Sequence, residues 1–197
     1  MRTSFRVACR VLVALLVAVV VGAVSPARAA SVEPGQAALL MLKILAYDRN
    51  LDSRAGDAVT VLVVHRAGHR ASEAVGAEMT RALQEASNSV TVANKPVRVL
   101  SAPYEDGTDV ADVLRGSGAT AVYLCPGLEG MLPAITTETQ QMRALSVSQV
   151  EQYVDDGVAV GILSRGAKAQ IVVNLPATKA EGVALSGTLL RLAEVRR

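Results

Sequence analysis

Apolar runs alternate with amphipathic segments through the middle of the chain. Residues 59–64 form a short run rich in β-branched side chains, which is typical of a strand covered on both faces. In residues 71–86, Val75, Met79 and Leu83 share one helical face, and Glu and Arg side chains take the other. This spacing predicts an amphipathic helix directly after the first strand.

The same alternation continues towards the carboxyl half. Residues 96–100 and 119–125 predict two further buried strands, and residues 108–115 between them predict a helix. Residues 128–142 predict another helix, which is interrupted near Pro133. A strand–helix order repeated in this way favours a parallel sheet with helices on both sides.

The two ends of the mature chain have different patterns. Residues 37–47 are apolar on nearly every face, so we expect a helix buried under the sheet or against a partner. Residues 144–147 predict a short strand, and residues 157–163 and 170–175 predict a hairpin joined by a five-residue loop. Apolar positions at helical spacing in residues 185–193 predict a closing helix.

These elements predict an α/β fold, a single-domain three-layer sandwich. Its sheet is mostly parallel and is followed by a C-terminal β-hairpin and a closing helix. We expect the core to contain Leu39, Leu42, Leu45, Val61, Val63, Val75, Met79, Leu83, Val122, Leu124, Ile171, Val173, Leu189 and Leu192.

The first 29 residues are typical of a secretory signal peptide. Three arginines precede an unbroken run of 14 apolar residues at Val11–Val24, and Ala27-Arg28-Ala29 supplies small residues for cleavage. A membrane-spanning helix needs about 20 residues, so the run is too short to span. We therefore expect a periplasmic protein, secreted through this peptide, whose single domain is residues 30–197.

Charge argues against a nucleic-acid binder. Four of the 20 basic residues and none of the 18 acidic residues lie in the first 29, so the remaining chain carries a net charge of −2. Binding to phosphate backbones requires a basic face. Cys125 is the one cysteine outside the leader, which excludes an intramolecular disulfide and a four-cysteine zinc site.

The stretch His65-Arg66-Ala67-Gly68-His69-Arg70 contains the most reactive set of side chains. It lies between a predicted strand and a predicted helix, where α/β sheets bind ligands and where helix N–H groups attract anions. Cys125 ends another strand of the same sheet, so His65, His69 and Cys125 could share a metal or small-ligand site. The alternative is that His65, Arg66, His69 and Arg70 simply solvate a surface turn.

A catalytic role for Cys125 would need a histidine base within hydrogen-bond reach. A buried cysteine at the end of a strand is the alternative. The sequence contains no G-x-S-x-G, H-E-x-x-H or G-x-x-x-x-G-K-[ST] motif. We therefore predict no enzyme activity, no catalytic residues, no resident metal and no cofactor.

Two segments resemble one family. The first is LKILAYDRNL at Leu42–Leu51, and the second is the closing stretch Gly157–Val195, with Asn174-Leu175, Gly182 and Leu189-Leu190-Arg191-Leu192-Ala193 as its most specific parts. Together they are similar to the YfiR family of periplasmic regulators. This chain has Asp48-Arg49 after Tyr47, where other members often have Val-Glu-Trp-Pro.

The resemblance implies a regulator without catalytic residues. Members of the family are associated with repression of a membrane-bound diguanylate cyclase through its periplasmic domain, which controls cyclic-di-GMP and biofilm formation. We also expect a homodimer, either through the face of residues 36–47 or elsewhere if that helix is buried under its own sheet. The alternative function is a periplasmic small-ligand or anion binding protein resembling one lobe of a solute receptor.

Overall fold

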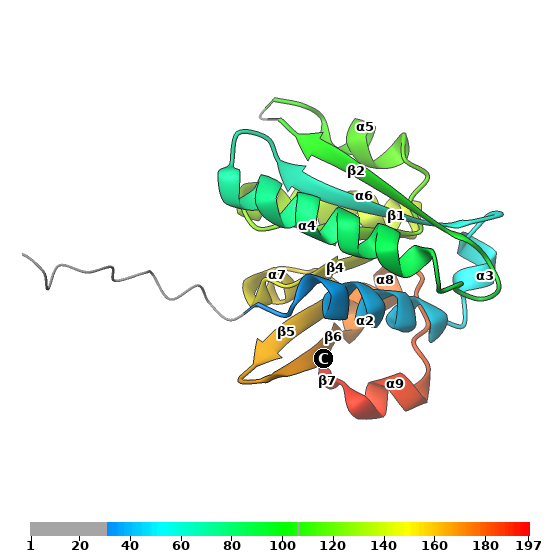
Figure 1. Ribbon diagram of the computed structural model, residues 1–197. Coiled ribbons are helices and arrows are strands. Elements are labelled where there is room, and N and C mark those ends of the chain that lie inside the picture. The colour runs from blue at the N-terminus through cyan, green and yellow to red at the C-terminus, as the bar shows by residue number, and fades with distance from the viewer. Residues whose placement is uncertain (1–30, 106) are drawn as a thin grey trace, which may run out of the picture. The chain divides into compact units, whose positions relative to one another are not determined.

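Seven strands form one sheet in the order β2-β1-β3-β4-β5-β6-β7 (Figure 1). The computed structural model describes residues 31–105 and 107–197, so the predicted signal peptide lies outside the described residues. The strands from β2 to β5 pair in parallel, β6 is antiparallel to β5, and β7 is parallel to β6. The strands are β1 Val59–Arg66, β2 Val97–Tyr104, β3 Ala121–Leu124, β4 Leu145–Ser148, β5 Val160–Arg165, β6 Lys168–Asn174 and β7 Glu194–Arg196.

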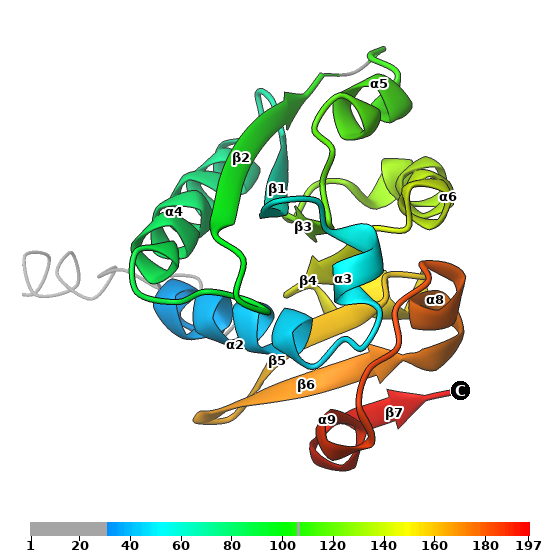
Figure 2. The same cartoon turned by 90° about the vertical axis from the view of Figure 1, so that its right-hand side faces the viewer.

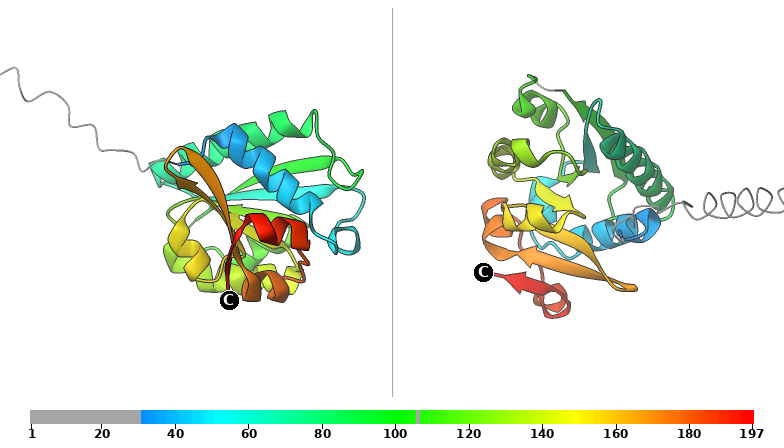
Figure 3. Two further views of the ribbon diagram at one scale, coloured as in Figure 1. Left: turned by 90° about the horizontal axis from the view of Figure 1, so that it is seen from below. Right: turned by 90° about the vertical axis from the view of Figure 1, so that its left-hand side faces the viewer.

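Helices cover both faces of this sheet, which confirms the three-layer α/β sandwich. Helices α2, α4 and α9 pack on one face, and α5, α6 and α7 pack on the other (Figures 2 and 3). The helices are α2 Pro34–Ala46, α3 Leu51–Arg54, α4 Arg70–Ser87, α5 Val110–Arg115, the 3-10 helix η1 Glu129–Met131, α6 Leu132–Met142, α7 Glu151–Asp155, α8 Leu175–Ala180 and α9 Gly187–Leu192. Within residues 31–105 and 107–197, no helix combines the length and the hydropathy needed to cross a membrane.

Strand β1 divides its side chains between two cores. Val61 and Val63 are buried with α2 and α4, whereas Leu62 and Val64 are buried with α5 and α6. This alternation follows from the two-residue period of a strand. Apolar side chains are therefore needed at consecutive positions 61–64 of β1, as the sequence predicted.

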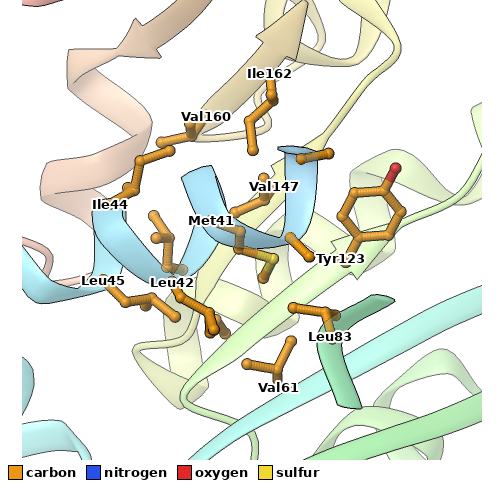
Figure 4. Packing of buried hydrophobic residues seen from close by; sticks show 14 of the residues in the cluster. Met41, Leu42, Ile44, Leu45, Val61, Leu83, Tyr123, Val147, Val160 and Ile162 are labelled. Carbon is orange, nitrogen blue, oxygen red and sulfur yellow. The ribbon is translucent and has the colours of Figure 1, made fainter. Parts of the chain in front are cut away.

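Helix α2 is largely core. Its N-cap Glu33 accepts a hydrogen bond from the backbone N–H of Gln36 at 2.9 Å, and Pro34 suits the first turn. Met41, Leu42, Ile44 and Leu45 point into the sheet and meet strand side chains such as Val61, Val147 and Val160 (Figure 4). The expectation for Leu39 is wrong, because its side chain lies on the outer face and is 53% exposed.

At the carboxyl end, the structure has a short helix followed by a strand, whereas we expected a single closing helix. Helix α9 ends at Leu192, and the chain then extends at Ala193 to form β7 beside β6. Leu189 is 2% exposed and belongs to the core, whereas Leu192 is 75% exposed. Leu192 is therefore not core, because the last residue of the short helix faces away from the sheet.

The hairpin of β5 and β6 is tighter than expected. Arg165 pairs with Lys168, so the turn contains two residues rather than five. Gly166 in this turn has φ +64°, a left-handed conformation that glycine adopts without a steric penalty.

Candidate functional site

The turn at residues 65–70 connects β1 to α4 at the carboxyl ends of the parallel strands, where we expected it. This side of the sheet is called its carboxyl edge, and the side of the strands' amino ends is called its amino edge. Cys125 directly follows β3, the strand next to β1, and its N–H donates to the carbonyl oxygen of Val64 at 3.0 Å. Neighbouring strands thus bring His65 and Cys125 to the same edge of the sheet.

His65 packs against helix α4. A Cβ atom at Gly76 would lie only 3.0 Å from the Cβ of His65, so the close approach of helix and ring requires glycine at this position. Nδ1 of His65 lies 3.5 Å from Oγ of Ser101 on β2. His65 is half-buried by these neighbours and holds β1 against α4 and β2.

His69 caps helix α4. Its Nδ1 accepts a hydrogen bond from the backbone N–H of Ser72 at 3.1 Å, which satisfies one of the donors at the start of the helix. The ring also lies against the loop after β3, because a Cβ at Gly127 would be 3.2 Å from Nδ1. This contact gives His69 a structural role in the junction.

Other donors of this turn also have acceptors within the chain. The N–H of Gly68 donates to Oε1 of Glu73 at 2.9 Å, and the N–H of Arg66 donates to Oγ of Ser72 at 2.8 Å. The carboxylate of Glu73 places a negative charge where an anion would sit, although Arg70 begins the helix and is exposed. This geometry argues against an anion at the start of α4.

Cys125 is enclosed by the core. Its side chain is buried, and burial raises the pKa of the thiol to about 12. A cysteine nucleophile or metal ligand acts as the thiolate, which this environment disfavours. Within the part of the chain that the structure describes, no three His, Cys, Asp or Glu side chains are placed to hold a metal ion.

A hydrogen-bonded chain next to His69 was not predicted from the sequence. The hydroxyl of Tyr153 donates to Oε1 of Glu129 at 2.9 Å and accepts from the N–H of Leu128 at 2.8 Å. Burial raises the pKa of Glu129, but backbone N–H groups, Tyr153 and the nearby His69 outweigh it and hold that pKa below its usual value. Glu129 and Tyr153 are 24 residues apart in regions without a motif, so no sequence pattern indicated this pairing.

A second polar cluster lies at the opposite, amino edge of the sheet. The carboxylate of Asp48 forms an ion pair with Arg54, and both side chains are at most 2% exposed. Oδ1 of Asp48 also accepts from the N–H of Ala184 at 2.8 Å, and Arg54 donates to the carbonyl oxygen of Thr120 at 3.1 Å. The pair thereby ties the turn after α2 to β3 and to the segment before α9.

Glu181 occupies the same edge and is buried. Its carboxylate accepts from the hydroxyl of Thr139 at 2.8 Å and from the N–H of Ser146 at 2.9 Å. Burial raises the pKa of Glu181 to about 7, against the opposing effects of these hydrogen bonds and of Arg54. The group joins the segment after α8 to α6 and β4.

The sequence profile of one family, described as YfiR/HmsC-like, matches residues 37–194. The chain belongs to the YfiR/HmsC-like family. A search of curated proteins finds no match to this chain. This match confirms the family that we predicted from residues Leu42–Leu51 and Gly157–Val195.

Solved structures resemble the YfiR/HmsC-like domain in fold. An ABC domain in complex with L-Trp from Streptococcus pneumoniae has a TM-score of 0.61 at 10% identity, and covers 81% of this chain and 60% of that one. A conserved domain protein from Vibrio cholerae has a TM-score of 0.60 at 12% identity, covering 86% and 61%. A ligand-free, open substrate-binding protein with adhesive properties from Clostridium difficile has a TM-score of 0.57 at 12% identity, covering 75% and 57%. This chain therefore spans about three fifths of the length of each of these proteins.

The two segments that carry the YfiR/HmsC-like resemblance lie side by side. The N–H of Ser186 donates to the carbonyl oxygen of Tyr47 at 2.9 Å, and the N–H of Arg49 donates to that of Ala184 at 3.0 Å. Asn50 donates through its side chain to the carbonyl oxygen of Gly182 at 3.0 Å. These contacts join the two segments at the amino edge of the sheet.

Proposed function

We propose that this chain is an exported, non-enzymatic regulator that binds and represses a membrane-bound diguanylate cyclase. The observation that supports it is the family match over residues 37–194, because regulation of such a cyclase is what the YfiR resemblance implies. In this proposal residues 1–29 are the signal peptide and residues 30–197 are the periplasmic domain.

The chemistry of the carboxyl edge supports a role without turnover. Cys125 is buried as a thiol of raised pKa, His69 is engaged as a helix cap, and His65 is packed against Gly76. Nucleophilic catalysis needs an activated nucleophile next to an available base. Stoichiometric binding requires none of these side chains to react.

Self-association is part of the proposal, and helix α2 is a poor surface for it. Six of its residues are buried in their own core, and Leu39 is its one strongly exposed large apolar side chain. Of the two expectations for this helix, burial under its own sheet describes most of α2.

Deletion of the gene followed by measurement of cyclic-di-GMP tests the regulatory proposal. We expect the concentration to rise, because a repressor of the cyclase is lost, and to return when the gene is restored. A purified domain of residues 30–197 should bind the periplasmic domain of the cyclase with a fixed stoichiometry. An unchanged concentration together with no binding would overturn the proposal.

Two variants separate regulation from ligand chemistry at the carboxyl edge. Cys125→Ala and the double variant His65→Ala/His69→Asn should restore repression, since asparagine keeps the helix cap of α4. The alternative function, small-ligand binding, is favoured by the likeness to a domain solved with L-Trp and to a substrate-binding protein. If either variant folds and is exported but does not restore repression, the alternative should replace our proposal.

A further inference from the structure

Helix α4 starts at a side chain that can take up a proton. Nδ1 of the N-cap His69 accepts a hydrogen bond from the backbone N–H of Ser72 at 3.1 Å. An amide N–H can only donate, so Nδ1 must present its lone pair, and a proton added there would face the N–H and abolish the bond. The usual N-cap residues, Ser, Thr, Asp and Asn, gain no proton between about pH 5 and 8, whereas histidine does. Capping by His69 and proton uptake at its Nδ1 therefore exclude each other.

Other hydrogen bonds of the turn depend on the same start of α4. Oγ of Ser72 accepts from the N–H of Arg66 at 2.8 Å, and Oε1 of Glu73 accepts from the N–H of Gly68 at 2.9 Å. The N–H of Glu73 in turn donates to the carbonyl oxygen of His69 at 3.0 Å. Both acceptor side chains are therefore placed by the first turn of the helix. Loss of the cap loosens the whole of residues 66–73 and not one amide alone.

A carboxylate lies beside the ring of His69. The ring packs on the loop after β3, where a Cβ atom at Gly127 would be 3.2 Å from Nδ1 and 3.3 Å from Cε1. The N–H of Gly127 donates to Oε1 of Glu129 at 3.3 Å, and the hydroxyl of Tyr153 donates to the same oxygen at 2.9 Å. Burial raises the pKa of Glu129, but backbone N–H groups, Tyr153 and His69 outweigh it and hold that pKa below its usual value. Glu129 therefore stays ionised over the range in which histidine takes up a proton, and it can pair with the charged ring.

The surroundings of His69 favour a charged ring. His69 and Glu129 are both exposed, so burial does not penalise the imidazolium. The titratable and charged residues that the turn, α4, the end of β2, the loop after β3 and α7 place at this edge are His65, Arg66, Arg70, Glu73, Glu105, Cys125, Glu129 and Tyr153. Three of them are carboxylates and two are guanidinium groups, so the balance of these charges favours a positive charge on the ring.

We propose that proton uptake by His69 switches the start of α4 between two arrangements. In the closed arrangement, the neutral ring accepts from the N–H of Ser72 and caps the helix. In the open arrangement, the imidazolium leaves Ser72 and pairs with the carboxylate of Glu129, and residues 66–73 lose their shared hydrogen bonds. Because the open arrangement holds the extra proton, acid favours it, and the cap is lost as the pH falls. This inference does not depend on the regulatory partner.

Hydrogen exchange at Ser72 tests the switch in the exported chain. The protection of this N–H, measured by NMR against the intrinsic exchange rate at each pH, reports whether the cap is closed. Imidazole side chains take up a proton at about pH 6.5, so the protection should fall about tenfold between pH 7.5 and 5.5. His69→Asn keeps the cap at every pH and should hold the protection constant, whereas His65→Ala should respond like the parent. Equal protection at both pH values in the parent, or the same loss in His69→Asn, overturns the proposal.

Glu129→Gln tests the open arrangement with the same measurement. Glutamine can still accept from Tyr153 but carries no charge, so the loss of protection at Ser72 should move to lower pH by roughly 0.2–0.7 units, as expected for an exposed ion pair. Glu85→Gln, an exposed carboxylate near the other end of α4, is the matched control and should leave the pH of this loss unchanged. Circular dichroism confirms that each variant is folded. A loss of protection that Glu129→Gln does not move overturns the pairing of His69 with Glu129.

Discussion

Glu181 is a carboxyl group whose burial makes the fold sensitive to pH. Its folded pKa is about 7, above its ordinary value of 4.5, so the folded chain holds this proton more tightly than the unfolded chain does. The resulting stabilisation is fully present below pH 4.5 and is lost as the pH rises through about 7. Carboxyl groups usually contribute in the opposite direction, through pKa values lowered in the folded state.

We predict that Glu181→Gln removes this pH dependence. Lowering the pH from 8 to 5 should stabilise the parent relative to the variant by on the order of 1–3 kcal/mol, because each pKa unit corresponds to about 1.4 kcal/mol. Glutamine can still accept from Ser146 and donate towards Thr139, so the variant should fold. Urea unfolding at the two pH values measures the difference, and identical pH profiles for the two proteins would refute the role of Glu181.

The leucines of the short helix α9 are buried to very different extents. Ser186 caps it through a bond from the N–H of Leu189 at 3.4 Å, and Leu189 enters the core shared with α2 and α4. Leu192, in the same helix, faces solvent. Two leucines three positions apart therefore contribute very differently to stability.

We predict that Leu189→Ala costs roughly 2–5 kcal/mol of unfolding free energy, because it removes buried methyl groups and leaves a cavity. Leu192→Ala in the same helix is the matched control and should change stability by less than about 0.5 kcal/mol. Thermal and urea unfolding of both variants provide the comparison. Equal melting of Leu189→Ala and the parent would mean that α9 does not dock as described.

The strands β1 to β6 and the longer helices could be predicted from the sequence, whereas several short helices and strand β7 could not. Strands β1 and β3 and helices α2 and α4 lie where hydrophobic spacing placed them, within a few residues at each end. Helices of four to six residues such as α3, α7 and α8 contain too few turns to show a 3.6-residue period. Strand β7 forms by pairing with β6, and such pairing is a tertiary interaction that local sequence does not show.

The position of the candidate site in the fold could be predicted from the sequence, but the chemistry of its side chains could not. A strand end followed by a helix start located residues 65–70 correctly at the carboxyl edge. Spacing could not reveal that His69 would cap α4 or that Cys125 would be enclosed, since both depend on contacts with distant segments. Glu129 with Tyr153, and Glu181 with Thr139, became visible only once the chain was folded.

At the scale of the whole molecule, the first helix and the last segments depend on one another. The backbone of Asp48 forms an isolated antiparallel β-bridge with that of Leu185. The carboxylate of Asp48 accepts a hydrogen bond from the N–H of Ala184, which lies 136 residues further along the chain. The same carboxylate forms the ion pair with Arg54, and both side chains are almost fully buried. A buried charge that loses its partner is costly, so the junction depends on both members.

We predict that Asp48→Asn destabilises the domain by roughly 3–5 kcal/mol, because it leaves the guanidinium of Arg54 buried without its counter-charge. Asp52→Asn, an exposed carboxylate in the neighbouring helix α3, is the control and should have little effect. Urea unfolding of the two variants decides the point. A small loss for Asp48→Asn would show that the pair contributes little to holding the junction.

The hydrogen bond between Tyr47 and Ser186 joins residues near the two ends of the described chain, so it can form only after nearly all of the chain has been made. During synthesis from the amino end, the apolar α2 is made early, but the backbone groups of residues 184–186 and the core side chain of Leu189, which complete its surroundings, are made last. Contacts so distant in sequence make folding slow and leave incomplete chains without a stable core. The surroundings of α2 can therefore be completed only when almost the whole chain is available.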